Sequence, residues 1–242
     1  MSFSATLPAP DRDPQALLAR LRREGVVRSA ASAGSAGGRS AFLPTGVEAL
    51  DRAVGGGLPC GRITEVVGAA SSGRTAFLFG VLASATSRGA QTALIDPADA
   101  FDPEAAALAG VRLDRVLWIR PQQALDAFRA ADLVLDAGGF GVVALEAGRA
   151  RSSSVWPRLS LRAERAGSVL LVSGERREAG TFAALVLRMH RGSARWAGGG
   201  VAPLLLERLD VRIEVLRSKV GGAAGPVPWA SSAKRKRSSD AA

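Results

Sequence analysis

The chain has 242 residues, and its 32 lysines and arginines outnumber its 22 aspartates and glutamates, which gives a formal net charge of +10. One cysteine excludes an internal disulfide, and one histidine excludes a Cys/His metal cluster and leaves a Ser-His or Cys-His nucleophile almost without support. The length predicts one large domain, and the charge favours nucleic acid or an acidic partner, although an arginine-rich genome gives the same composition.

The N-terminal region lacks both a signal-peptide pattern and a long apolar run, so we expect a cytoplasmic protein with no membrane contact. Leu17, Leu18 and Leu21 share one face of a short predicted helix. Residues 28–40 are rich in Ser, Ala and Gly, which is typical of a flexible linker. Residues 1–40 are therefore predicted to be a tethered amphipathic helix, either a partner-binding helix or a terminal appendage.

Residues 41–220 are predicted to form the core domain. Thr45 and Glu48 have the spacing of a capping box at the start of a short helix. Apolar strands then alternate with helices, which indicates an α/β fold with a mostly parallel sheet covered by helices. The strands are predicted at residues 62–67, 92–95, 116–119, 140–145 and 168–172, and the helices near 76–82, 104–109, 122–135 and 156–166.

Residues 68–75 read G-A-A-S-S-G-R-T and lie between the first core strand and its helix. Strand, glycine-bounded loop and helix is the order in which backbone N–H groups surround phosphate oxygens. The spacing is that of a P-loop, but the basic residue is Arg74, whose forked guanidinium is wider than a lysine ammonium. The loop therefore predicts the phosphate-loop fold more strongly than phosphate chemistry.

The last third of the chain has a different pattern. Residues 186–195 and 204–216 alternate with a period near two and are joined through Gly198–Gly200, which predicts an antiparallel hairpin added to the sheet. Residues 221–242 are rich in Gly, Ala, Pro and Ser and end in the basic run 234–237. We predict that this segment is a disordered basic tail.

Three stretches carry a family resemblance. Residues 43–76, L-P-T-G-V-E-A-L-D-R-A-V-G-G-G-L-P-C-G-R-I-T-E-V-V-G-A-A-S-S-G-R-T-A, resemble the start of the RecA recombinase core. The likeness continues in A-L-I-D-P-A-D-A-F-D-P at 93–103 and in E-V-L-R-S-K-V at 214–220. It implies a RecA-like P-loop core without the globular C-terminal domain of RecA.

The resemblance also exposes changed functional positions. The catalytic glutamate that orients water in RecA corresponds to Ala98, with the shorter Asp99 beside it, and the magnesium-associated aspartate corresponds to Glu146, or to Leu145 in another register. RecA's γ-phosphate-sensing glutamine falls at Ser173 or Gly174. Because phosphoryl transfer depends on positioned charge, these changes argue against efficient hydrolysis.

The predicted site is a degenerate nucleotide site that binds ATP and magnesium weakly or not at all, in a protein that is not expected to be an efficient enzyme. Its residues are Gly68, Ser71, Ser72, Gly73, Arg74, Thr75 and Glu146.

Other basic residues are assigned through the resemblance. The two RecA loops that line the DNA channel are shortened here, and their arginines are candidates for non-specific single-stranded DNA contact or are merely solvated: Arg149, Arg151, Arg176 and Arg177. Arg217 and Lys219 match the RecA basic pair that reaches a neighbouring subunit's nucleotide.

A RecA-like core with worn nucleotide motifs and a basic tail resembles the ImuA family. That resemblance implies an adaptor in damage-induced translesion DNA synthesis (SOS mutagenesis), with an ImuB-like Y-family polymerase homologue and RecA as partners, located in the cytoplasm or at the nucleoid. Two alternatives stay open: an active DNA-dependent RecA-like ATPase or recombinase, and a SulA-like inhibitor of cell division.

Overall fold

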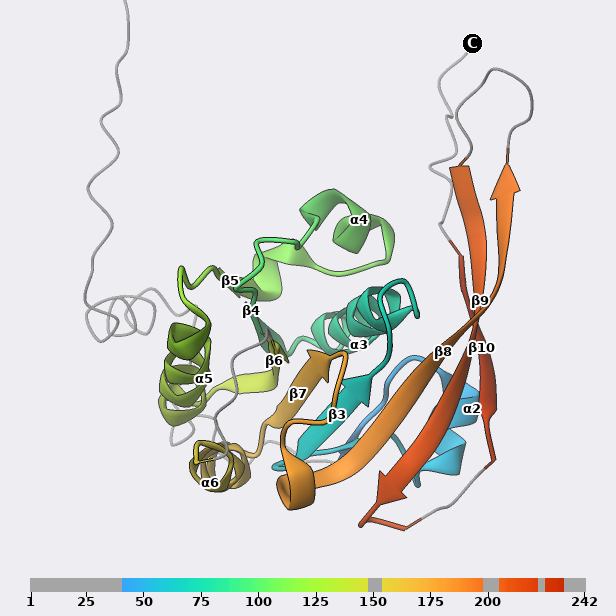
Figure 1. The fold of residues 1–242 in the computed structure, drawn as a ribbon. Helices are drawn as coiled ribbons and strands as arrows, with labels where there is room; N and C mark the ends of the chain where they lie inside the picture. The colour runs from blue at the N-terminus through green and yellow to red at the C-terminus, as the bar shows by residue number, and fades with distance from the viewer. Residues whose placement is uncertain (1–40, 148–153, 198–204, 222–224, 233–242) are drawn as a thin grey trace, which may run out of the picture.

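The computed structural model describes residues 41–147, 154–197, 205–221 and 225–232. Its main sheet has eight strands in the order β10-β9-β8-β3-β7-β6-β4-β5, and a two-stranded sheet pairs β1 with β2 (Figure 1). The six strands from β8 to β5 are parallel, whereas β9 and β10 are antiparallel additions at one edge. The predicted α/β fold with a mostly parallel sheet and a C-terminal antiparallel hairpin is confirmed.

The strands and helices alternate along the first two thirds of the chain. The strands are β1 Phe42–Leu43, β2 Leu58–Pro59, β3 Ile63–Val67, β4 Gln91–Ile95, β5 Val116–Ile119, β6 Phe140–Glu146, β7 Val169–Gly174, β8 Ala183–Ala197, β9 Leu205–Ser218 and β10 Val227–Ser232. The helices are α2 Glu48–Ala53, α3 Arg74–Ser87, α4 Pro103–Leu108, α5 Ala124–Ala137 and α6 Trp156–Ala166, with 3-10 turns η1 Leu113–Arg115 and η2 Gly180–Phe182.

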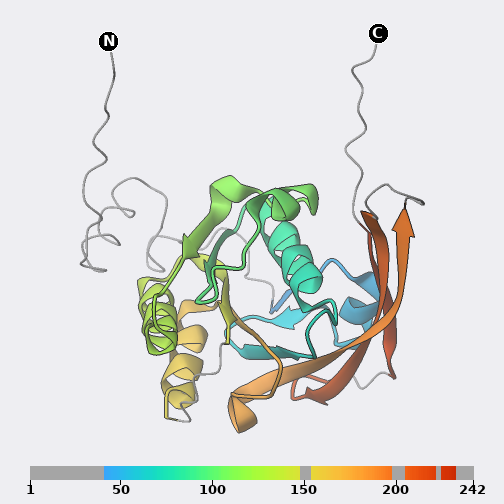
Figure 2. The same cartoon turned by 45° about the horizontal axis from the view of Figure 1, so that its top comes forward.

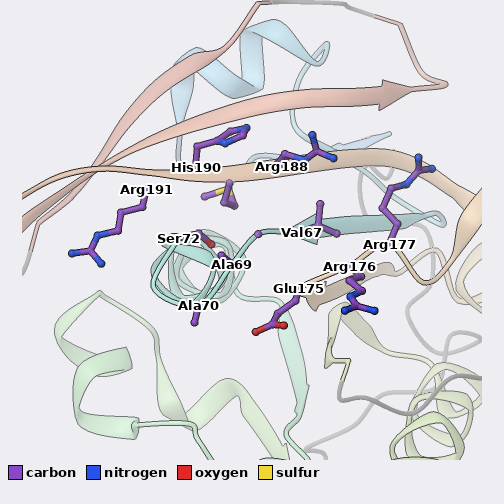
Figure 3. Close-up of a pocket in the computed structure, with 12 residues that line it drawn as sticks. Val67, Ala69, Ala70, Ser72, Glu175, Arg176, Arg177, Arg188, His190 and Arg191 are labelled. Atoms are coloured by element: carbon purple, nitrogen blue, oxygen red, sulfur yellow. The ribbon is translucent and has the colours of Figure 1, made fainter.

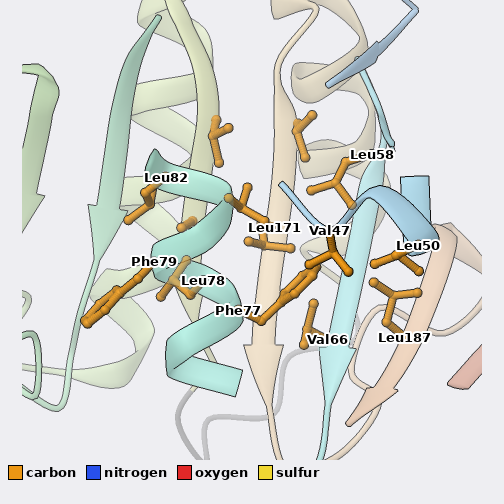
Figure 4. Close-up of a cluster of buried hydrophobic side chains, with 14 of the residues drawn as sticks. Val47, Leu50, Leu58, Val66, Phe77, Leu78, Phe79, Leu82, Leu171 and Leu187 are labelled. Carbon is orange, nitrogen blue, oxygen red and sulfur yellow. The ribbon is translucent and has the colours of Figure 1, made fainter. Parts of the chain in front are cut away.

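Two apolar layers cover the two faces of the sheet. Successive strand residues point to opposite faces, so in β7 Leu171 joins the layer around α3 while Leu170 and Val172 join the layer around α5 and α6. Figure 4 shows the first layer, in which Phe77 of α3 lies among side chains of α2, β3 and β8. Burial on both faces explains why these strands read as continuous apolar runs in the sequence.

The antiparallel strands curve toward the phosphate-loop helix (Figure 2). Val211 and Ile213 of β9 are buried in the same layer as Phe77, and Trp229 of β10 meets the Phe77 ring edge-on with the ring centroids 6.1 Å apart. Helix α3 is therefore covered by the sheet on one side and by β9 and β10 on another.

The prediction of a disordered tail from residue 221 is wrong for Val227–Ser232. These residues form β10, which pairs with β9 from the register partners Val227 and Ile213 to Ser232 and Arg208. Composition was misleading because the two apolar anchors of the strand, Val227 and Trp229, stand among small and proline residues, and only the β9 edge makes them a strand.

The capping-box prediction is also wrong. Helix α2 has Val47 at its N-cap position, without a side-chain cap. The Thr45 hydroxyl accepts a hydrogen bond from the Val47 backbone N–H at 3.0 Å and donates to the Asp51 carboxylate at 2.7 Å. Asp51, rather than Glu48, closes the turn, because its carboxylate also accepts from the Thr45 backbone N–H.

Several predictions concern residues outside the described ranges. They are the helix with Leu17, Leu18 and Leu21, the loop arginines Arg149 and Arg151, the turn at 198–200 and the basic run at 234–237. Within the described ranges, no helix is both long enough and apolar enough to cross a membrane.

Candidate phosphate-binding site

The loop between β3 and α3 has the backbone shape that a phosphate cradle requires. Gly73 is the N-cap of α3 in the left-handed conformation, with φ of 96°, and Ser71 also has a positive φ of 59°. Gly68 is held tightly, since a Cβ added there would lie 2.5 Å from the Ser72 Oγ and 2.7 Å from the Met189 carbonyl oxygen. Glycine is therefore required at both bounding positions, and the first turn of α3 directs its free N–H groups toward the loop.

One side of the loop faces the ends of β7, β6 and β4, which are consecutive neighbours in the sheet. The Arg74 guanidinium donates to the Ser173 hydroxyl at 3.1 Å, and its charge also acts on Glu146. Asp96, at the end of β4, is buried, and one of its carboxylate oxygens accepts the Phe101 backbone N–H at 2.8 Å. Four predicted or neighbouring site groups thus meet along one edge of the sheet.

The charge balance at this edge disfavours an ionised Glu146. Burial raises the pKa of the Glu146 carboxyl above its ordinary value, and the neighbouring Asp96 raises it further. Arg74 and the hydrogen bond from Ser173 act in the opposite direction but do not reverse the shift. The raised pKa means that ionising Glu146 costs more here than in water, a cost that a magnesium ion bound at this carboxyl would have to offset.

The position that matches the RecA catalytic glutamate carries no carboxylate. Ala98 is exposed, and Asp99 adopts a positive φ of 51°. The Asp99 carboxylate pairs with Arg120 at 3.6 Å. The nearest acidic side chain along the chain is thus already engaged with a neighbouring cation.

The other side of the loop opens into a cleft of about 560 Å³ between the loop, the segment after β7 and strand β8 (Figure 3). Arg176 and Arg177, two of the predicted arginines, line this cleft. Arg188 and Arg191 of β8 line it as well, and the sequence analysis missed them. Their sequence signal is the dense basic pattern of β8, a stretch that the sequence analysis interpreted only as one strand of an antiparallel hairpin.

A buried acid holds the segment after β7 in place. Glu65 of β3 is only 1% exposed, and its Oε1 accepts the backbone N–H groups of Glu178 at 2.5 Å and Ala179 at 2.7 Å. Arg177 approaches the other carboxylate oxygen of Glu65 at 3.9 Å. The sequence signal for this role is the one charged residue within the buried strand β3.

The basic pair at the end of β9 contacts its own subunit. The Arg217 guanidinium donates to the Gly180 carbonyl at 2.8 Å, and the Lys219 ammonium donates to the Thr181 carbonyl. Both acceptors belong to η2, so the pair fixes the turn that leads into β8. The assignment of these residues to a neighbouring subunit's nucleotide stays a prediction.

The described residues are better suited to binding a phosphate group than to catalysing phosphoryl transfer. The loop backbone and the exposed Thr75 hydroxyl would hold the phosphate and a magnesium ion, which when bound would polarise the phosphate. Ser72 is only 3% exposed, and its Oγ has no hydrogen-bond partner within the described residues, so it too is available to a ligand. A positioned general base is not present at position 98.

Fold and loop together define a P-loop α/β domain. The chain matches the model of the RecA N-terminal domain over residues 33–161 and therefore belongs to that family. It is 42% identical over 105 residues to Protein RecA of Methylococcus capsulatus, covering 43% of this chain and 30% of that protein. It is 31% identical over 176 residues to Protein RecA of Frankia alni, covering 72% of this chain and 47% of that protein. The chain thus spans less than half the length of these relatives.

Proposed function

We propose that this RecA-like protein is an accessory factor of damage-induced translesion DNA synthesis, of the ImuA type, whose nucleotide site does not drive hydrolysis. The observation that carries the proposal is the internal engagement of Arg74. Its guanidinium donates to Ser173 and its charge acts on Glu146, so the one cation of the phosphate loop is directed at protein groups. A guanidinium held against protein groups in this way is not positioned on a transferring phosphoryl group, and phosphoryl transfer depends on positioned charge.

Two further features support the proposal. Ala98 supplies no general base, and Asp99 is paired with Arg120. Arg217 and Lys219 donate to carbonyls of their own η2 turn, which leaves fewer of their donors for a nucleotide of a neighbouring copy. Weak binding of Mg-ATP is compatible with all of these features, because the loop keeps its shape.

The proposed partners are an ImuB-like Y-family polymerase homologue and RecA, with non-specific single-stranded DNA as an additional electrostatic ligand. The adaptor would work in the cytoplasm, at the nucleoid. Support comes from the RecA-family core combined with the changed nucleotide site, because function depends on the site carried by a fold and this site lacks groups that phosphoryl transfer requires.

Phosphate release from ATP tests the nucleotide half of the proposal. Wild-type protein and Thr75→Ala should both release phosphate at the background rate, with and without single-stranded DNA. A DNA-stimulated rate that Thr75→Ala abolishes would instead identify the chain as a DNA-dependent ATPase and refute the adaptor.

Co-purification with the ImuB-like protein and with RecA tests the partner half. A truncation after Val220 is unsuitable for this experiment, because it would remove β10 and the contact between Trp229 and Phe77. Deletion from residue 233 keeps β10, and the pair Leu17→Asp with Leu21→Asp tests the N-terminal segment separately. Loss of RecA binding only in the leucine variant would support separate surfaces, whereas no binding to either protein by wild-type chain would refute the adaptor.

A further inference from the structure

Strand β8 has an open edge beside the phosphate loop. It has 15 residues, whereas its parallel neighbour β3 has 5 and covers it only as far as Arg188. From Met189 to Ala197, no strand among the described residues pairs with β8 on the β3 side, although β9 pairs along the other side. An open strand edge presents backbone N–H and C=O groups that a further strand can pair with.

The open edge begins at the cationic cleft. Arg188 and Arg191 lie on β8 at the start of the edge, and Arg176 lies on the opposite wall (Figure 3). Within the described residues, Arg176 and Arg191 are exposed and have no ion pair, while Arg188 acts on Glu214. Four arginines line the cleft against one carboxylate, that of Glu175. Because Arg177 already approaches Glu65 at 3.9 Å, the positive charge that the cleft leaves for a ligand is chiefly that of Arg176 and Arg191.

A buried hydroxyl points to the same cleft. Ser72 is 3% exposed, lines the cleft and has no partner for its Oγ within the described residues. A buried polar atom without a partner costs stability unless a ligand or water completes its hydrogen bond. This side of the loop is separate from the Arg74 side, because Arg74, Thr75 and Glu146 do not line the cleft.

We propose that this cleft receives an acidic, extended segment of a partner protein, which adds to the open edge of β8. The inference rests on the proposed adaptor function and gives it a binding surface. The arginines select acidic side chains, and the strand edge selects a polypeptide, because a nucleic acid backbone cannot pair with a β-strand ladder. The pairing register of β8 with β9 shifts between Arg191 and Ala194, as at a β-bulge. This irregularity limits which partner segments can pair along the whole edge.

A terminally blocked peptide that alternates valine and glutamate is the probe. Fluorescence anisotropy with the full chain should show binding that weakens with salt, as expected for exposed charges. Arg176→Glu with Arg191→Glu should weaken it by about tenfold or more. The matched control, Arg129→Glu with Arg165→Glu on α5 and α6, makes the same change in net charge away from the cleft and should weaken it by about threefold or less.

A second peptide tests whether binding depends on pairing with the strand edge. A peptide of the same charge in which proline replaces alternate valines cannot form the ladder and should bind about tenfold more weakly. Hydrogen exchange in the wild-type chain should slow at residues 191–197 when the valine-glutamate peptide is added. Equal binding of the proline peptide, or equal losses in the cleft and control variants, would overturn the proposal.

Single-stranded oligothymidylate completes the test. If it binds in a manner that depends on Arg176 and Arg191 while the peptide does not bind, the cleft is a nucleic-acid site and the inference is wrong. If the glutamate double variant does not fold, Arg176→Gln with Arg191→Gln should still weaken peptide binding by about threefold or more. Failure of the peptide test with hydrolysis still absent refutes only this surface, whereas DNA-stimulated hydrolysis refutes the adaptor itself.

Discussion

The two sides of the phosphate loop use their charges in different ways. On the Arg74 side the guanidinium donates to Ser173 and its charge lowers the pKa of Glu146, while burial keeps that pKa above its ordinary value. On the Ser72 side the cleft exposes arginines that outnumber its single carboxylate. The first arrangement is internally satisfied and resembles a structural network, while the second is open to an anionic ligand. The same loop can therefore lose one function and support another.

The largest effect should come from Gly73→Ala, which disturbs both sides at once. The variant must keep a φ of 96° and would place its Cβ 2.7 Å from a Val211 methyl group. Backbone strain and overpacking together should lower the free energy of unfolding by about 3 kcal/mol. Gly89→Ala is the control, because its φ is 84° but nothing lies within 4 Å of the added Cβ, and it should lose only about 1 kcal/mol. If denaturant titrations show equal losses of stability in the two variants, the Val211 side chain moves aside with no measurable change in free energy.

Glu65→Ala should have the next largest effect on stability, and it should affect only the Ser72 side of the loop. It leaves the backbone N–H groups of Glu178 and Ala179 without their acceptor, which should cost about 2 kcal/mol. Hydrogen exchange at these two amides should accelerate, and the cleft should lose its peptide affinity. Glu65→Gln keeps an acceptor oxygen and should lose clearly less stability. Unchanged exchange in Glu65→Ala would mean that other contacts hold this segment.

Glu146→Gln should affect the Arg74 side alone. Its effect on the free energy of unfolding should be smaller than that of Glu65→Ala and of opposite sign. Because folding raises the pKa of Glu146, the ionised carboxylate is penalised in the folded state at neutral pH, and the penalty disappears as the pH falls below the ordinary value of the group. Glutamine removes the penalty, so the variant should be more stable than wild type at neutral pH and equal to it in acid. A stability advantage that grows with acidity would contradict this assignment.

The smallest effect on folding is expected for Ser72→Ala. Its Oγ has no partner within the described residues, so the variant loses no internal hydrogen bond and removes a buried unpaired polar atom. The free energy of unfolding should therefore be unchanged or raised by about 0.5 kcal/mol. Urea titration of both proteins measures the difference. A loss of stability well above 1 kcal/mol would show that an ordered water or ion already satisfies the hydrogen bonding of the Ser72 hydroxyl.

The parallel part of the fold was predictable because its information is local. Strands buried on both faces, such as Val142 to Leu145 in β6, read as apolar runs, and the glycine bounds of the phosphate loop fix its position between β3 and α3. Strand β10 was not predictable from composition. Its apolar residues Val227 and Trp229 form part of a strand only because the edge of β9 pairs with them, and Trp229 also packs against the Phe77 ring.

The sequence by itself determined the parallel α/β core and the phosphate loop, because apolar periodicity and glycine spacing directly encode local backbone geometry. The family followed from the likeness of the sequence to RecA. Only the tertiary structure decided what the charges do. Arg74 of α3 lies far in the chain from Ser173 and Glu146 at the ends of two neighbouring strands, yet it acts on both, while Arg176 and Arg191 line the same cleft. Pairing and burial are properties of spatial neighbours, so one arginine became part of an internal network while the others stayed open to solvent.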